Sequence, residues 1–183
     1  MRTKIRDAAL GLFDKRGFHG ASIRDIAAEA DCSLPTLYYY YKSKEQLYDT
    51  VVCEAYEQIA EQIAEQMPEG MPLADTCYFY IMQRRLMTGA EKIVLRLAAK
   101  IQMGFDGTPE GRARVLRCDA ARVDRMRAEL TALNAPPEFE RLFFHVTEHL
   151  LQRAALGDEL ESDDVRGEID LLFGILERQE NHR

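Results

Sequence analysis

The sequence has few cysteines and no long apolar run. Its four cysteines, Cys32, Cys53, Cys77 and Cys118, are spread over 183 residues and form no CxxC pair, so neither a zinc site nor a disulfide framework is indicated. No apolar run reaches the roughly 18 residues that a membrane span needs. The basic N-terminus MRTKIRDAAL lacks the unbroken apolar stretch of a secretory signal. We therefore expect a cytoplasmic protein without membrane contact, in which the cysteines are small buried apolar residues.

Catalytic motifs are also scarce. The chain has no serine elbow, no phosphate-cradling glycine loop and no pair of catalytic carboxylates, and we expect neither an enzyme nor a cofactor. One segment, HVTEH at 145–149, fits the H-x-x-E-H pattern of some zinc hydrolases. His145 and His149 could share a metal ion with Glu148 beside them. The match is short and no downstream acidic ligand is identifiable, so an all-α metal-dependent hydrolase is the alternative hypothesis.

Charge is distributed unevenly along the chain. The formal net charge is −7. Residues 1–47 nevertheless hold eight Lys and Arg against six Asp and Glu. A mildly basic N-terminal segment on an acidic body indicates that only one end of the protein meets an anionic partner.

The apolar periodicity is helical almost throughout, and no strand is predicted. Ser22, Ser33 and Ser43 are placed as N-caps, and Gly17 as the end of the first helix. Nine helices are expected: one ending at Gly17, three beginning at these serines, and five over 73–87, 90–103, 109–133, 138–156 and 162–180.

The run of four tyrosines at 38–41 lies in the third expected helix. The second and third helices are separated only by Asp31 and Cys32, which is typical of a helix-turn-helix. Neighbours on a helix are about 100° apart, so the four rings cannot share one core. We place Tyr41 in the core, Tyr38 at its border, and Tyr39 and Tyr40 in solvent.

The exposed face of this third helix suits DNA. Tyrosine hydroxyls donate hydrogen bonds to phosphate oxygens, and the small side chains of Pro35 and Thr36 can reach base edges, including a thymine methyl group. Lys44 is placed at the first position of the next helix, where the macrodipole disfavours a cation. A phosphate bound there would remove that conflict, and the alternative is a merely solvated lysine.

The segment IRDAALGLFDKRGFHGASIRDIAAEADCSLPTLYYYYKSKEQLYDTVV resembles the DNA-binding domain of the tetracycline-repressor (TetR) family of transcriptional regulators. Asp31 stands where glycine is usual, Pro35 where glycine is common, and Tyr41 where phenylalanine is usual. The resemblance implies an all-α, nine-helix architecture. A three-helix helix-turn-helix domain would cover residues 1–47 and a helical ligand-binding and dimerisation domain residues 48–183.

The same resemblance implies a homodimer that binds a palindromic operator in double-stranded DNA, most often as a repressor that a small-molecule effector releases. It assigns the DNA contacts to Ser22, Ser33, Leu34, Pro35, Thr36, Tyr38, Tyr39, Tyr40 and Lys44.

The C-terminal part carries no motif of its own. Its last two expected helices are apolar on more than one face, which requires more than one partner. Gly167 and Gly174 lie on one side of the last helix and would allow another backbone to approach closely. We expect a four-helix dimer interface, with a core inside one chain as the alternative. The interface residues would be Phe139, Phe143, Val146, Leu150, Ile169, Leu172, Phe173 and Leu176.

The effector pocket is expected among the helices between residues 50 and 150. Sulfur-bearing and aromatic side chains there form an adaptable set that suits a largely apolar ligand, although each residue alone is as well explained as core. The predicted pocket residues are Tyr78, Met82, Leu86, Met103, Phe105, Cys118 and Phe144.

Overall fold

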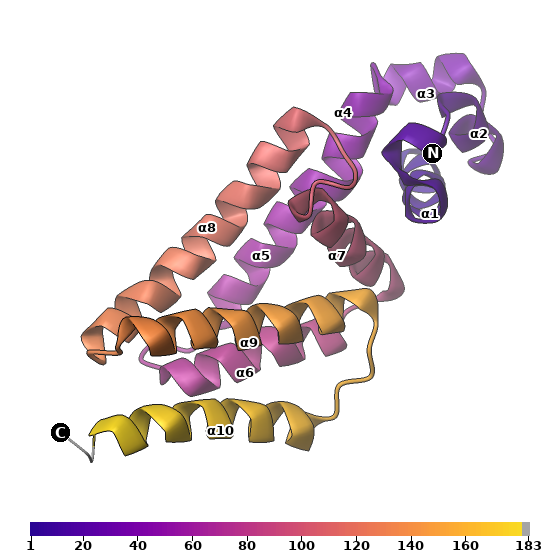
Figure 1. Ribbon diagram of the computed structural model, residues 1–183. Coiled ribbons are helices and arrows are strands. Elements are labelled where there is room, and N and C mark those ends of the chain that lie inside the picture. Colours follow the sequence, from indigo (N-terminus) through magenta and orange to yellow (C-terminus); the bar gives the residue numbers. More distant parts are fainter. Residues whose placement is uncertain (181–183) are drawn as a thin grey trace. The chain divides into compact units, whose positions relative to one another are not determined.

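The computed structural model describes residues 1–180, and over this range the chain is helical and contains no strand (Figure 1). The elements are α1 (Arg2–Gly20), α2 (Ile23–Glu29), α3 (Leu34–Tyr40), α4 (Lys44–Tyr48), η1 (Asp49–Glu54), α5 (Ala55–Gln66), α6 (Leu73–Arg85), α7 (Gly89–Gln102), α8 (Pro109–Ala132), α9 (Pro137–Leu156) and α10 (Ser162–Glu180). Because α4, η1 and α5 follow one another without a break, the described chain has nine helices, which confirms the predicted all-α class. Within residues 1–180, no helix is both long enough and apolar enough to cross a bilayer.

The predicted helix starts are confirmed by their capping hydrogen bonds. Each of Ser22, Ser33 and Ser43 accepts a hydrogen bond on its Oγ from the backbone N–H three residues later, at 3.1–3.2 Å. This satisfies one of the backbone donors that the first turn of a helix leaves unpaired. Asp31, in the turn between α2 and α3, has φ 51°, which is the left-handed geometry that a short polar side chain tolerates.

The first helix kinks at Gly17, where the sequence predicts its end, and one further turn reaches Gly20. Gly17 has φ 70° and ψ 173°, so the backbone leaves helical geometry there. A side chain at a positive φ would be strained, which explains why glycine occupies this position. The kink turns the chain toward the start of α2.

The six-residue π-helix η1 was not predicted. It is wider than an α-helix, and it lies where α8 approaches closely: a Cβ atom on Gly111 would lie only 2.8 Å from Cys53 Sγ. Apolar periodicity alone does not distinguish a π turn inside a longer helix from an α turn.

The chain packs into two compact units. The first comprises Met1–Glu61 and Thr88–Cys118, and the second comprises Gln62–Met87 and the chain from Asp119 onward. In the first unit α7 packs on α1, and the Arg96 guanidinium donates to both carboxylate oxygens of Asp14, at 3.2 and 2.7 Å. This unit thus joins α7 to the three N-terminal helices, and the predicted domain boundary at residue 47 stays a prediction.

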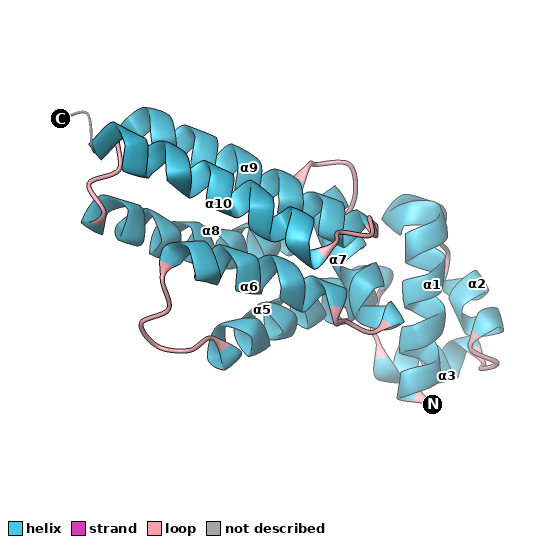
Figure 2. Ribbon diagram, turned by 90° about the horizontal axis from the view of Figure 1, so that it is seen from below, coloured by secondary structure: helices cyan, strands magenta, loops and turns pink. Residues whose placement is uncertain are grey.

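Each unit has its own aromatic core. In the first, the Tyr48 ring meets Phe13 and Phe18 edge to face, with ring centroids 4.8 and 5.0 Å apart. In the second, α6, α9 and α10 lie side by side (Figure 2). There the Phe173 ring packs 5.9 Å from Phe139 and 6.1 Å from Phe143.

Candidate nucleic-acid interface

In the helix-turn-helix, buried side chains hold α3 in place. Leu37 of α3 and Ile26 of α2 are completely buried, and Tyr41, just after α3, is only 2% exposed. These side chains fix one face of α3 against α2, which itself packs on α1. The opposite face of α3 is therefore held toward solvent by packing.

The tyrosine run divides between core and solvent. Tyr39 is 82% exposed, Tyr38 49% and Tyr40 36%, whereas Tyr41 is buried. The predicted exposure of Tyr39 and Tyr40 and the predicted burial of Tyr41 are confirmed. Tyr38 is more exposed than its predicted border position implies. The Tyr39 and Tyr40 rings meet edge to face at 5.1 Å, so α3 presents a continuous aromatic surface.

The first turn of α3 and the start of α2 lie on the surface too. Pro35 and Ser22 are exposed, and Leu34 and Thr36 are half-buried. The hydroxyl of Ser33 lies 2.8 Å from that of Thr36, so the two hydroxyls are bonded to each other. The residues predicted to meet DNA therefore lie on or beside α3 or at the start of α2, with the exception of Lys44.

Lys44 has partners that the sequence did not predict. Its ammonium donates to the backbone carbonyls of Phe18, at 2.8 Å, and Ala21, at 3.1 Å. The same ammonium lies 4.4 Å from the centre of the Phe18 ring. The lysine that was expected to face a phosphate or solvent thus stabilises the turn that follows the α1 kink.

The backbone N–H of Phe18 also has a side-chain partner. The Phe18 N–H donates to the Asp106 carboxylate, with N–O distances of 2.8 and 3.1 Å. Asp106 lies in the loop after α7, 88 residues along the chain. We call this arrangement, Asp106 on the N–H and Lys44 on the carbonyl of Phe18, the Phe18 bracket.

Tyr48 contacts the Asp106 carboxylate of the Phe18 bracket. Its hydroxyl lies 3.5 Å from an Asp106 carboxylate oxygen, and its side chain is fully buried. Burial, and then the negative charge of Asp106, raise the pKa of the Tyr48 hydroxyl. Tyr48 therefore stays protonated and can donate to Asp106. Sequence reasoning missed this site because its signals, an aspartate in a loop and a tyrosine in a helix, are individually unremarkable.

The residues predicted for a dimer interface are mostly enclosed within one chain. Phe139, Phe143, Leu150, Ile169, Leu172 and Leu176 are each no more than 7% exposed, and Val146 and Phe173 are half-buried. Six of the eight side chains are thus core of the second unit, which was the alternative that the sequence left open. A contact between two chains through α9 and α10 would need more exposed residues of these helices than those six.

The outward faces of α9 and α10 supply such residues. Leu171 is 64% exposed and Leu142 38% exposed. A Cβ atom on Gly167 would meet nothing within 4 Å, and one on Gly174 would meet only the Arg178 guanidinium at 3.9 Å. The glycines are seven residues apart and so lie on one side of α10, with Leu171 between them.

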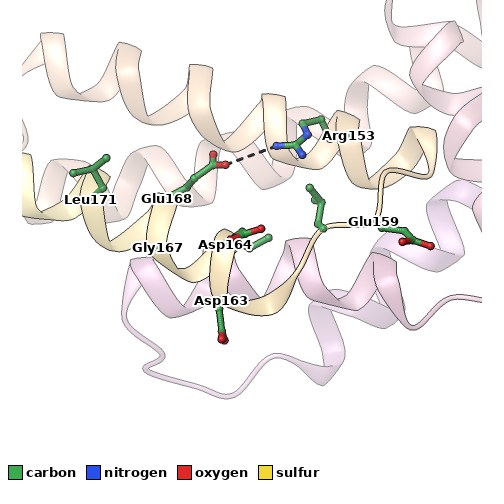
Figure 3. A pocket seen from close by; sticks show the side chains of 9 residues that line it. Arg153, Glu159, Asp163, Asp164, Gly167, Glu168 and Leu171 are labelled. Atoms are coloured by element: carbon green, nitrogen blue, oxygen red, sulfur yellow. Dashed lines mark ion pairs between the residues drawn. The ribbon is translucent and has the colours of Figure 1, made fainter.

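A shallow groove of about 380 Å³ adjoins this face (Figure 3). Gly167 and Leu171 line it from α10, and Arg153 lines it from α9. Arg153 bonds to Asp158 at 3.0 Å and lies 3.7 Å from a Glu168 carboxylate oxygen. The groove is therefore largely charged, because α10 also lines it with Asp163, Asp164 and Glu168.

The predicted effector residues are distributed over both units. Leu86, Met103 and Phe105 are 79%, 46% and 77% exposed, so these three lie at the surface. The remaining four are half-buried: Tyr78, Met82, Cys118 and Phe144. Tyr78 bonds through its hydroxyl to Ser162 Oγ at 2.7 Å, and the Phe144 ring lies 5.4 Å from the Arg127 guanidinium. The pocket stays a prediction.

The HVTEH segment lies in α9. His145 and His149 are exposed, whereas Glu148 is half-buried and forms an ion pair with Arg122. The described part of the chain holds no group of three or more His, Cys, Asp or Glu side chains that could bind a metal ion. No observation favours the hydrolase hypothesis over the DNA-binding one.

Comparison with known proteins agrees with this geometry at the N-terminus. A family model described as "Bacterial regulatory proteins, tetR family" matches residues 5–51. The chain is 41% identical over 56 residues to the probable HTH-type transcriptional regulator YttP of Bacillus subtilis, which is 31% of this chain and 27% of that protein. It is 38% identical over 48 residues to the biofilm operon icaADBC HTH-type negative transcriptional regulator IcaR of Staphylococcus epidermidis, 26% of each chain. These matches span about a quarter of the curated relatives' length.

Solved structures resemble the chain over almost its whole length. A TetR-like transcriptional regulator from Rhodococcus sp. RHA1 has a TM-score of 0.62 at 22% identity, covering 93% of this chain and 92% of that one. The regulator FadR of Bacillus subtilis, solved in complex with stearoyl-CoA, has a TM-score of 0.67 at 18% identity, covering 94% and 97%.

The fold and the site together define an all-α protein whose N-terminal helix-turn-helix presents α3 to solvent. With the match over residues 5–51, the N-terminal part of the chain is similar to the tetR family of bacterial regulatory proteins.

Proposed function

We propose that the protein is a ligand-responsive DNA-binding transcriptional regulator. It binds a palindromic operator as a homodimer, acts as a repressor, and is released by a small, largely apolar effector. The observation that carries this proposal is the exposed aromatic face of α3, since Tyr39 is 82% exposed on a helix whose opposite face is buried. A recognition helix held in this way can enter the major groove without rearranging its core.

The contacts on DNA follow from the chemistry of that face. The hydroxyls of Tyr38, Tyr39 and Tyr40, together with that of Ser22, are suited to phosphate oxygens. Pro35 and its neighbours Ser33, Leu34 and Thr36 lie at the end of α3 that reaches base edges in this kind of motif. We assign Lys44 to the Phe18 bracket, because two backbone carbonyls already accept from its ammonium.

The homodimer would form through the outward faces of α9 and α10. Leu171 and Leu142 are exposed apolar residues there, and the open sides of Gly167 and Gly174 let a second helix approach. Two helices from each chain would make a four-helix interface. Repression agrees with IcaR, the relative described as a negative regulator, which this chain resembles over its N-terminal part.

The dimer is tested by substituting Leu171. Leu171→Glu places a charge in the apolar contact and is expected to turn a dimer into a monomer in light scattering coupled to size exclusion, with a large loss of operator affinity. The matched control is Leu133→Glu, because Leu133 is a 43% exposed leucine that directly follows α8 and belongs to neither α9 nor α10. Loss of the dimer in both variants, or in neither, would contradict the proposed interface.

The effector class rests on composition and on one structural neighbour. The half-buried side chains Tyr78, Met82 and Phe144 are adaptable and largely apolar, and the neighbour FadR binds stearoyl-CoA. Stearoyl-CoA and stearate are therefore the first probes to titrate into a protein–operator complex. Release by either supports an apolar acyl effector, and release by neither argues against that class.

The DNA-binding function itself is tested by selection. Purified full-length protein is incubated with random duplexes, and the bound fraction is sequenced over several rounds. We expect an enriched palindromic sequence whose affinity falls steeply as salt concentration rises, because phosphate contacts release counterions. Absence of any enriched sequence would reject the proposal.

A further inference from the structure

The HVTEH segment holds a pair of histidines that the proposed DNA-binding function does not use. His145 and His149 lie in α9, four residues apart, and both are exposed. Of the four histidines in the chain, they alone have this spacing. Side chains at i and i+4 of a helix lie on the same face, with Cβ atoms about 5–6 Å apart. The two imidazoles therefore share one exposed surface of α9.

Both imidazoles are available as ligands. Within the described part of the chain, neither ring has a hydrogen bond, an ion pair or an aromatic contact. The carboxylate between them in sequence, that of Glu148, is paired instead with the guanidinium of Arg122, whose side chain is only 11% exposed. The exposed chemistry of the segment is therefore that of two imidazoles without a carboxylate.

Two imidazoles without a carboxylate restrict the kind of ion that can bind. Imidazole suits Zn²⁺, Cu²⁺ and Ni²⁺, whereas Mg²⁺ and Ca²⁺ require oxygen ligands. A zinc–nitrogen bond measures about 2.0–2.1 Å, so two ligand nitrogens on one ion lie at most about 4 Å apart. Side chains on successive turns of a helix can converge to that separation, which is why histidine pairs with this spacing bind zinc in other proteins.

We propose that His145 and His149 chelate one divalent transition-metal ion per chain on the exposed surface of α9. The site is not catalytic, because Arg122 holds the only carboxylate of the segment. Two protein ligands fill half of a tetrahedral shell, and water fills the rest. The ion joins successive turns of α9, so its binding stabilises the folded chain. This site goes beyond the proposed regulator function and does not depend on it.

The test uses full-length protein that has been treated with EDTA and then dialysed. Isothermal titration calorimetry measures the binding of Cu²⁺, Ni²⁺ and Zn²⁺, with Mg²⁺ and Ca²⁺ for comparison. We expect one ion per chain for each of the three transition metals, with Cu²⁺ the tightest, and no binding of Mg²⁺ or Ca²⁺. Free Zn²⁺ at about 100 times its Kd should raise Tm by about 5–10 °C.

Protein variants assign the binding to the pair. His145→Gln and His149→Gln each remove one ligand. Loss of a mere outer-shell partner of a metal ligand weakens metal binding about 10–100-fold, so each variant should bind at least about ten-fold more weakly and lose the rise in Tm. His19→Gln is the matched control, because His19 is an exposed histidine in α1, and it should bind as wild type does. Melts in EDTA verify the fold of every variant.

Three results would overturn the inference. The first is a wild-type protein that binds none of the three transition metals. The second is wild-type affinity in both His145→Gln and His149→Gln. The third is equal weakening in His19→Gln, since the ions would then be held by scattered surface histidines rather than by the pair. No DNA enters these measurements, so a negative result leaves the regulator function standing.

Discussion

Replacing Lys44 by methionine should destabilise the N-terminal helices without removing a phosphate contact. Lys44→Met keeps an unbranched apolar stem and deletes the ammonium that bonds to the Phe18 and Ala21 carbonyls at 2.8 and 3.1 Å. Hydrogen bonds to charged groups are worth about 1.5–3 kcal/mol each when buried. Lys44 is only half-buried, so water replaces part of each bond.

The ammonium also lies 4.4 Å from the Phe18 ring centre, which adds about 0.5–1 kcal/mol at an exposed site. With the hydrogen bonds discounted for hydration, we expect a loss of about 2 kcal/mol in unfolding free energy. For a chain of this size, this corresponds to a fall in Tm of about 4–8 °C.

Circular dichroism melts measure the stability, and anisotropy titrations at several salt concentrations measure the DNA contact. The control is Lys42→Met, since Lys42 is exposed and its side chain has no place in the Phe18 bracket. We expect the control to melt like wild type. Lys44→Met should keep the wild-type dependence of log affinity on log salt. An unchanged Tm together with a salt slope reduced by about one would refute the reasoning, since that is the signature of a lost phosphate contact.

Three further results are expected. Tyr41→Ala removes a ring that is 2% exposed and should cost about 3–5 kcal/mol of stability, while Tyr41→Phe should stay close to wild type; equal melts for alanine and wild type would contradict the core assignment. Burial raises the pKa of Cys53 and of Cys77 to about 12, so both thiols stay protonated at pH 8, and iodoacetamide should label them only upon unfolding; rapid labelling of either in the native protein would show that it is accessible. Asp106→Ala leaves the Phe18 N–H without its acceptor, so amide exchange at Phe18 should accelerate, and unchanged exchange would exclude a bracket in solution.

The starts of the N-terminal helices were predictable because they depend on local chemistry. Serine caps at 22, 33 and 43 and the glycine at 17 act within one turn of chain, and all were found where the sequence puts them. The division of the tyrosine run followed from helical geometry alone. Tyr38 departed from its expected border position, since a side chain at the edge of a short helix has few neighbours to cover it.

The contacts that the sequence did not predict join partners far apart in sequence. No periodicity connects Asp106 to Phe18, and the macrodipole argument for Lys44 considered its own helix but not the carbonyls of α1 that reach its ammonium. The dimer set stays a prediction, and the sequence could not refine it for a different reason. Apolar stripes on α9 and α10 show that these helices have several partners, but they do not show which stripe faces the core of the same chain, and Phe143 and Ile169 proved to be completely buried there.

The most direct test of the central claim is a titration of the selected palindrome with wild type and with Tyr39→Ala. Tyr39 is 82% exposed, so its removal should leave the melting curve unchanged. The account predicts two protomers per palindrome for wild type, affinity that falls steeply with salt, and at least ten-fold weaker binding by Tyr39→Ala, from the loss of one hydrogen bond and the ring's contact, together about 1.4 kcal/mol or more. Equal affinity of the two proteins for the palindrome would contradict the claim that the exposed face of α3 is the surface that meets DNA.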